Sequence, residues 1–183
     1  MLKKILLAIA VLASTAAMAA DPAPYVGAGL GIVNNTSSDA GNGSAFFRGV
    51  PFNAFVGYGG VVNQALYLAG EVGGTVGTGE ISNHYGLKTT YSYGASVLPG
   101  FMLSDHTLAF ARVGAVKTRF SNQDKTASGG QFGLGLQTSL TPELDLRGEY
   151  DFTAYNSFTS SGNDRISSPR SDAFNLGVVY KFD

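Results

Sequence analysis

The chain has 183 residues, with 12 Lys and Arg against 13 Asp and Glu, 25 glycines and no cysteine. Without cysteine there is neither a disulfide framework nor a thiolate metal site, and the near-neutral charge offers no basic stripe for a nucleic acid. Beyond the N-terminal segment, no apolar run reaches the ~18 residues that a membrane-spanning helix needs, which excludes a helical membrane protein.

The first twenty residues have the pattern of a secretory signal peptide. Lys3 and Lys4 precede an apolar segment at 5–13, and Ala17-Met18-Ala19 is a small-x-small cleavage site. The apolar segment is too short for a retained membrane anchor. We therefore predict a signal peptide over residues 1–19 and one domain over residues 20–183.

Eight later segments alternate apolar residues with small or polar ones, the period typical of strands with one apolar face. In chain order these segments are 25–33, 50–58, 66–76, 90–103, 109–116, 131–140, 144–152 and 173–182. Pro99 lies inside the fourth segment and has no N–H to donate, so we predict a β-bulge or an early strand end there.

The connections between these segments alternate between short and long. Short turns at 59–65, 104–107 and 141–143 alternate with polar segments at 34–48, 78–88, 121–128 and 156–170. This asymmetry is typical of outer-membrane barrels, which have tight periplasmic turns and longer outer loops. A soluble β-sandwich would also alternate. However, the second face here carries glycine, serine, glutamine and charge, as a small lumen requires. We predict an all-β, eight-stranded antiparallel up-and-down transmembrane β-barrel in the outer membrane of a Gram-negative bacterium, with both termini periplasmic.

Seven ionisable residues have the parity of the lumen face. They are Glu71, Arg112, Asp145, Arg147, Glu149, Asp151 and Lys181. Charges inside a membrane-spanning segment are costly unless paired or hydrated, so we predict an interior ion-pair network in which Arg112 meets Glu71 or Glu149. Such a network could hold the barrel shut or gate a narrow pore. The small bore of an eight-stranded barrel favours the first role.

Aromatic residues near the segment ends predict a belt at each membrane interface. The expected outer belt is Phe46, Phe47, Tyr91, Tyr93, Phe120, Phe152 and Tyr155. The expected periplasmic belt is Tyr58, Phe101, Phe110, Tyr180 and Phe182, although Phe110 has lumen parity. For Phe46 and Phe47, an exposed contact patch is the alternative.

The sequence offers little for catalysis. The two histidines, His84 and His106, are predicted at opposite ends of the barrel and cannot share a metal or a proton relay. His84 with Ser82 and Glu80 forms the one candidate hydrolase cluster, which we interpret as polar loop residues. We expect no enzymatic activity, no metal and no cofactor.

Five stretches carry a family resemblance: 25–31, 55–59, 111–114, 147–152 and the C-terminal strand. With them the chain resembles the small outer-membrane β-barrels of the OmpA/OmpX and opacity-type surface-antigen group. The resemblance implies that barrel-assembly machinery reads the C-terminal pattern polar-x-Gly-x-x-aromatic-x-aromatic, here Asn175, Gly177, Tyr180 and Phe182. Asp183 departs from the family, whose members commonly end on the aromatic residue.

The resemblance also implies a function. We expect a non-enzymatic surface barrel that supports envelope integrity and presents outer loops to a host or matrix ligand. Its other partners would be outer-membrane lipid and lipopolysaccharide. The alternative is a narrow channel for small solutes or ions, gated by the lumen ion pairs.

Overall fold

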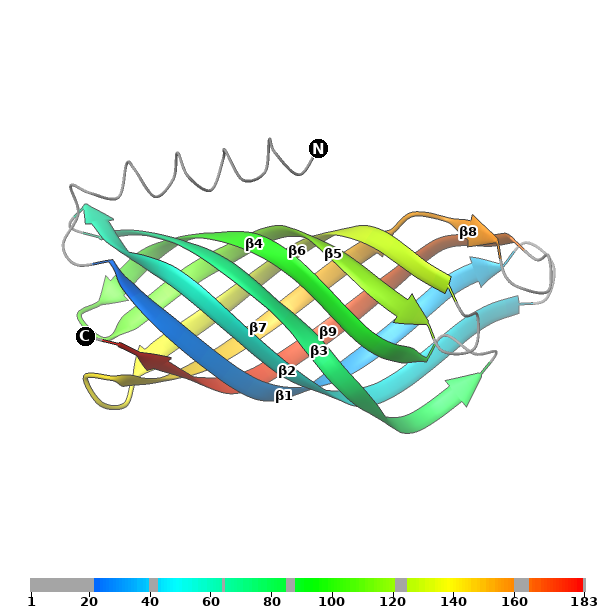
Figure 1. The fold of residues 1–183 in the computed structure, drawn as a ribbon, viewed down its shortest axis with the longest axis horizontal. Coiled ribbons are helices and arrows are strands. Elements are labelled where there is room, and N and C mark those ends of the chain that lie inside the picture. Colours follow the sequence, from blue (N-terminus) through cyan, green and yellow to red (C-terminus); the bar gives the residue numbers. More distant parts are fainter. Residues whose placement is uncertain are drawn as a thin grey trace.

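The computed structural model describes residues 22–39, 43–63, 65–84, 88–120, 125–159 and 165–182, and they form one closed antiparallel barrel (Figure 1). The predicted signal peptide and Asp183 lie outside these ranges. Within them, no helix is long and apolar enough to cross a bilayer. The strands are β1 Ala23–Asp39, β2 Gly43–Asn63, β3 Leu66–His84, β4 Thr89–Ser104, β5 Thr107–Phe120, β6 Lys125–Ser139, β7 Leu144–Tyr155, β8 Phe158–Thr159 and β9 Arg165–Lys181.

Neighbouring strands pair in chain order, and β1 closes the sheet against β9. The short β8 continues β7 along β9 in an unchanged register, since Ala154 pairs with Arg170 and, four residues on, Phe158 pairs with Ile166. The barrel therefore has eight strand positions, which confirms the predicted fold. We call the end that holds the start of β1 and the end of β9 the periplasmic end, and the opposite end the outer end.

The outer hairpins are longer than the sequence suggested. The segments 34–48, 78–88, 121–128 and 156–170 were predicted as polar loops, and this is wrong for most of their described residues, which continue the strands. The β1–β2 ladder, for example, runs as far as Asp39 opposite Gly43. Backbone pairing does not require apolar alternation once a strand has left the lipid, so a polar sequence does not end a ladder.

One register shift in this region has a clear cause. Phe52 pairs with Val76 but Pro51 pairs with Thr78, so Gly77 is the extra residue of a bulge. Its φ is 68°, which glycine adopts without steric cost.

The predicted bulge or strand end at Pro99 is also wrong. β4 continues to Ser104, and its pairing with β5 keeps one register from Val97 opposite Val113 to Gly100 opposite Phe110. Proline is tolerated because Pro99 pairs only with Leu68 on β3, and the β5 side of the ladder is simply unpaired at this point.

The outward face is an apolar band, as period-2 alternation predicts. Leu30, Val56 and Leu176 are among its exposed members, and Tyr180 packs edge-on against Phe182 near the periplasmic end. Exposed apolar residues on every long strand need a lipid environment.

The two predicted aromatic belts are partly wrong. Phe47, Phe110 and Phe120 point into the lumen, where Phe47 is 0% and Phe120 1% exposed. Tyr155 also turns inward, and its hydroxyl lies 3.1 Å from that of Thr118. The remaining predicted belt residues are exposed: Phe46, Tyr58, Tyr91, Tyr93, Phe101, Phe152, Tyr180 and Phe182. Strand parity decides between lipid and lumen, and all four residues have the lumen parity of their strands. Phe47, Phe120 and Tyr155 lie in strand extensions that were not predicted, whereas the parity of Phe110 already pointed to the lumen.

Candidate functional site in the lumen

The structure brings all seven predicted lumen charges onto the inner face of the barrel. Asp145, Arg147, Glu149 and Asp151 alternate along β7, so their side chains share one side of that strand. Glu71 comes from β3, Arg112 from β5 and Lys181 from β9. Strands that lie far apart around the wall therefore place opposite charges in one bore.

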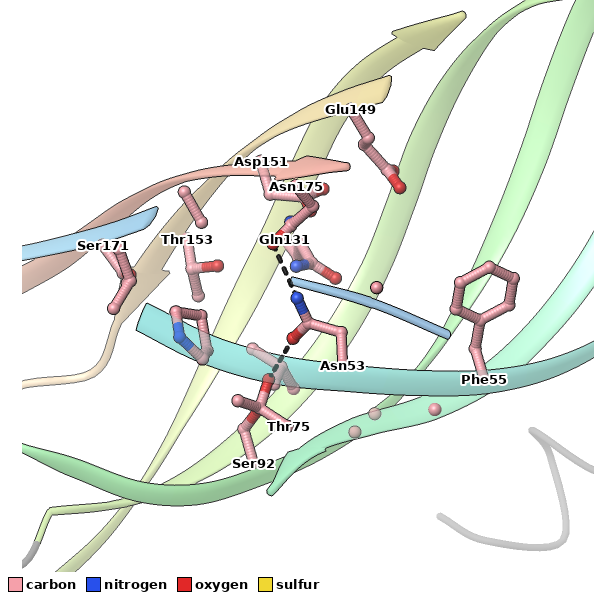
Figure 2. A pocket seen from close by; sticks show the side chains of 18 of the residues that line it. Asn53, Phe55, Thr75, Ser92, Gln131, Glu149, Asp151, Thr153, Ser171 and Asn175 are labelled. Carbon is pink, nitrogen blue, oxygen red and sulfur yellow. Dashed lines mark hydrogen bonds between the residues drawn. The ribbon is translucent and has the colours of Figure 1, made fainter. Parts of the chain in front are cut away.

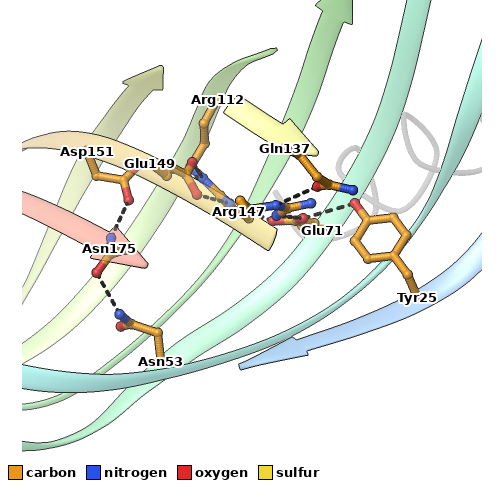
Figure 3. Close-up of polar contacts among 9 residues, drawn as sticks. All are labelled: Tyr25, Asn53, Glu71, Arg112, Gln137, Arg147, Glu149, Asp151 and Asn175. Carbon is orange, nitrogen blue, oxygen red and sulfur yellow. Dashed lines mark hydrogen bonds and ion pairs between the residues drawn. The ribbon is translucent and has the colours of Figure 1, made fainter. Parts of the chain in front are cut away.

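Glu71 lies at the centre of the network and joins both arginines. Its Oε2 accepts a hydrogen bond from Arg112 Nη2 at 2.6 Å, and its Oε1 accepts one from Arg147 Nη1 (Figure 3). Arg112 also binds Glu149 through two donors, since Nε bonds Oε1 and Nη2 lies 3.0 Å from Oε2. These contacts cross the bore and tie β3, β5 and β7 together.

Arg147 is held by rings as well as by charges. Its Cζ lies 4.6 Å from the ring centre of Phe55, 5.0 Å from that of Phe110 and 5.6 Å from that of Tyr25. Nη2 of Arg147 has no hydrogen-bond partner among the described residues. The negative faces of the rings compensate a buried cation at this position.

A chain of polar contacts continues toward the periplasmic end. Arg147 Nε donates to Gln137 Oε1 at 2.7 Å, and Gln137 Nε2 donates to Asp145 Oδ2 at 2.6 Å. Lys181 Nζ then lies 3.0 Å from Asp145 Oδ1. The predicted network is thus continuous only because a neutral residue, Gln137, links its two parts.

Sequence reasoning missed several members of this site. Gln137 bridges charges, and Tyr25 donates its hydroxyl to Glu71 Oε1 at 2.9 Å. Both residues have lumen parity in their strands. Counting every polar or aromatic side chain of that parity, instead of charges alone, would have found them.

An apolar cluster fills the lumen beside the charges. Its buried members are Tyr25, Tyr67, Ala69, Leu98, Leu108, Phe110 and Val179. Glycines on neighbouring strands make room for the rings: a Cβ added to Gly135 would lie 2.3 Å from Phe110 Cζ, and one added to Gly57 would lie 2.3 Å from Tyr25 Cζ. The lumen is therefore packed with the protein's own side chains at this level.

Within the described part of the barrel, an outer and a periplasmic cavity have no lining residue in common. The outer one has a volume of about 150 Å³, and its lining runs from Glu71 and Arg147 to Thr89 and Tyr155. Figure 2 shows the part of this lining around Asn53, Asp151 and Ser171. The periplasmic one has a volume of about 230 Å³ and is lined by residues such as Tyr67 and Lys181. The charge network and the apolar cluster lie between them.

The predicted assembly-signal residues have places of their own in the folded barrel. Asn175 lies in the lumen, where it donates to Asp151 Oδ2 at 3.0 Å and accepts from Asn53 at 2.7 Å. A Cβ on Gly177 would lie 2.5 Å from the carbonyl oxygen of Ala28. Tyr180 and Phe182 face outward. Recognition of this pattern by assembly machinery stays a prediction.

The candidate hydrolase cluster shows no catalytic geometry in its described part. Glu80 is exposed and pairs with Lys88 at 3.3 Å, while Ser82 is exposed on the same hairpin. The side chain of His84 lies outside the described residues, and His106 lies in the β4–β5 turn at the opposite end. The described residues contain no group of three His, Cys, Asp or Glu side chains that could hold a metal.

Comparison with known proteins identifies the family. Residues 5–182 match the model of the outer membrane protein beta-barrel domain. The chain belongs to this family. It is therefore an outer-membrane protein of Gram-negative type, and the apolar band described above is its lipid-facing surface.

Solved members of this barrel type share its fold. The attachment invasion locus protein Ail of Yersinia pestis has a TM-score of 0.53 at 13% identity, over 89% of this chain and 100% of its own. Neisserial surface protein A (NspA) has a TM-score of 0.55 at 22% identity, over 87% of this chain and 97% of its own. No curated protein sequence matches the chain significantly.

Proposed function

We propose that this protein is a non-enzymatic surface barrel that supports the integrity of the outer membrane and presents its outer hairpins for contact with a host or the environment. The observation that carries the proposal is the occupied bore. Arg112 and Arg147 bind Glu71 across the lumen, and an apolar cluster fills the space beside them. A rigid closed barrel is a stable support for surface hairpins, whereas a transport pore requires an open path.

The charge of the outer hairpins suggests the class of ligand. At and beyond the outer edge of the apolar band, the described side chains include more basic than acidic groups. The basic ones are Arg48, Lys88, Lys117, Arg119 and Arg170, and the acidic ones are Glu80 and Asp172. A structure of Ail, which has the same fold, holds the heparin analogue sucrose octasulfate. We infer that a sulfated or otherwise anionic polysaccharide is the ligand class to test.

The binding test uses the refolded protein in lipid nanodiscs with sucrose octasulfate and heparin as probes. We expect salt-sensitive binding that weakens when Lys117, which is exposed on the outer side of β5, is changed to Gln. Lys181→Gln removes the same charge near the periplasmic end and is the matched control. Equal binding by both variants and the parent protein would contradict the polysaccharide proposal.

The envelope role has its own test. A strain that lacks this protein should become more sensitive to detergent, and expression of either the parent barrel or Lys117→Gln should restore resistance. An unchanged sensitivity after deletion would contradict the role in integrity.

A narrow channel is the second candidate, and the outer cavity that reaches the charged side chains of Glu71, Arg112 and Arg147 favours it. This candidate predicts discrete single-channel steps in a planar bilayer, abolished by Glu71→Lys. A folded barrel that shows no single-channel steps would support a closed lumen and the surface role.

Lipid modification is a further activity to exclude. It predicts that His84→Ala changes the lipid profile, and we expect no change.

A further inference from the structure

The acidic and basic side chains that line the outer cavity are unequal in number. Three carboxylates, those of Glu71, Glu149 and Asp151, face the guanidinium groups of Arg112 and Arg147. Asp145 and Lys181 form a separate pair that does not line this cavity. An excess charge inside a lipid-surrounded bore is costly unless a counter-charge neutralises it.

Asp151 is the one of these three carboxylates to which neither arginine donates a hydrogen bond. Glu71 takes a donor from each arginine, and Glu149 takes two donors from Arg112. Among the basic groups of the described residues, Asp151 is near Arg112 Nε alone, and that nitrogen lies 3.6 Å from its Oδ1, too far for a hydrogen bond. Asp151 is 6% exposed, and its Oδ1 has no hydrogen-bond partner among the described residues.

Neutral polar side chains line the cavity near this carboxylate, and the Asn175 amide N–H donates to its Oδ2 at 3.0 Å. Figure 2 shows the side chains of Asp151, Asn175, Gln131 and Asn53 gathered on one side of the cavity. Gln131 lies opposite Thr153 in the β6–β7 ladder, on the lumen face. Carboxylate, amide and hydroxyl oxygens are ligands for hard cations, and a cavity of about 150 Å³ holds an ion with several waters at ~30 Å³ each.

We propose that Asp151 binds one small monovalent cation, Na⁺ or K⁺, with neutral oxygens of Gln131 and Thr153 completing its shell. A charge of +1 cancels the excess, whereas a divalent ion would reverse it and would find one free carboxylate oxygen. The ion exchanges with the outer side, since the cavity lining continues to Thr89 and Tyr155 and the charge network closes the opposite side. The proposed surface function does not use this site, so a test of the cation site does not test the surface function.

Thermal unfolding of the refolded protein at pH 8 tests the site. Na⁺ or K⁺ is compared with the bulky cation N-methyl-D-glucamine at constant ionic strength. Because a ligand that binds only the folded state stabilises it, we expect the midpoint to rise by about 2–4 °C in Na⁺ or K⁺. Asp151→Asn should lose this rise. Asp172→Asn removes an acid on the outer face, bound to the Tyr150 hydroxyl, and should keep it.

A direct measurement needs no variant. Crystals grown in rubidium chloride should give an anomalous scattering peak beside the Asp151 carboxylate. A midpoint that ignores the cation but falls between pH 6 and pH 9 would overturn the proposal in favour of a bound proton. A midpoint indifferent to both the cation and pH, with no rubidium peak, would overturn it in favour of water alone.

Discussion

Arg112 and Glu149 meet side-on in the bore, with Arg112 Nε bonded to Glu149 Oε1 and Nη2 3.0 Å from Oε2. This two-donor geometry is the strongest form of an arginine–carboxylate contact and joins β5 to β7 across the lumen. It also leaves one donor, Nη2, shared with Glu71. Arg112 is therefore the residue on which most of the outer part of the network depends.

Arg112→Ala should destabilise the barrel by about 3–5 kcal/mol, because it leaves the buried Glu149 without its cation and removes one of the two cations bound to Glu71. Urea unfolding in detergent micelles measures the change. Arg48→Ala, which removes an exposed arginine from the outside of β2, is the control and should have little effect. If Arg112→Ala neither lowers stability nor raises bilayer conductance, the network neither holds the barrel closed nor gates a pore.

Glu71 and Arg147 should behave as one unit in a double-mutant cycle. Arg147→Met keeps the contact with the surrounding rings but removes the charge, and Glu71→Gln removes the opposite charge. Glu71→Gln leaves Arg147 without a carboxylate, and Arg147→Met leaves Glu71 with Arg112 as its remaining cation. We therefore expect the double variant to be more stable than the sum of the single effects by on the order of 1–3 kcal/mol. Additive effects would show that the pair contributes no coupling.

Gly135→Ala should cost about 1–3 kcal/mol, because its Cβ would lie 2.3 Å from the ring of Phe110 inside a packed lumen. Gly130 is on the same strand but has open space around an added Cβ. Gly130→Ala should therefore be neutral or slightly stabilising. Unfolding free energies of the two variants decide the point, and equal values would contradict the packing argument.

Phe182→Ala should reduce the amount of folded barrel in cells while leaving refolding in detergent unchanged, if assembly machinery reads the C-terminal pattern. The heat-dependent gel shift measures the folded fraction in both settings. Phe174→Ala removes another exposed ring from β9 and is the control, since Phe174 lies outside the predicted signal. Equal losses in cells for the two variants would argue against a specific signal.

The barrel could be predicted from the sequence because period-2 alternation is a local property. Leu176 and Val178 read as lipid-facing without knowledge of any partner, and the charges of β7 fall on the other face for the same reason. Strand number and the candidate lumen charges followed from this one pattern. The ends of the strands could not be predicted in this way, because outside the lipid a ladder continues with any polar sequence. In β3, the bulge at Gly77 also changes which side chains face the lumen.

Only the tertiary structure decided which charges meet. Glu71 and Arg147 are separated by 76 positions in the chain, and register, barrel closure and strand tilt bring them together. The sequence shows four carboxylates and three basic groups on the lumen face, but not which acid is left over. The two-donor contact of Arg112 with Glu149 assigns the excess to Asp151, because a guanidinium group has a fixed set of donors that neighbouring carboxylates must share.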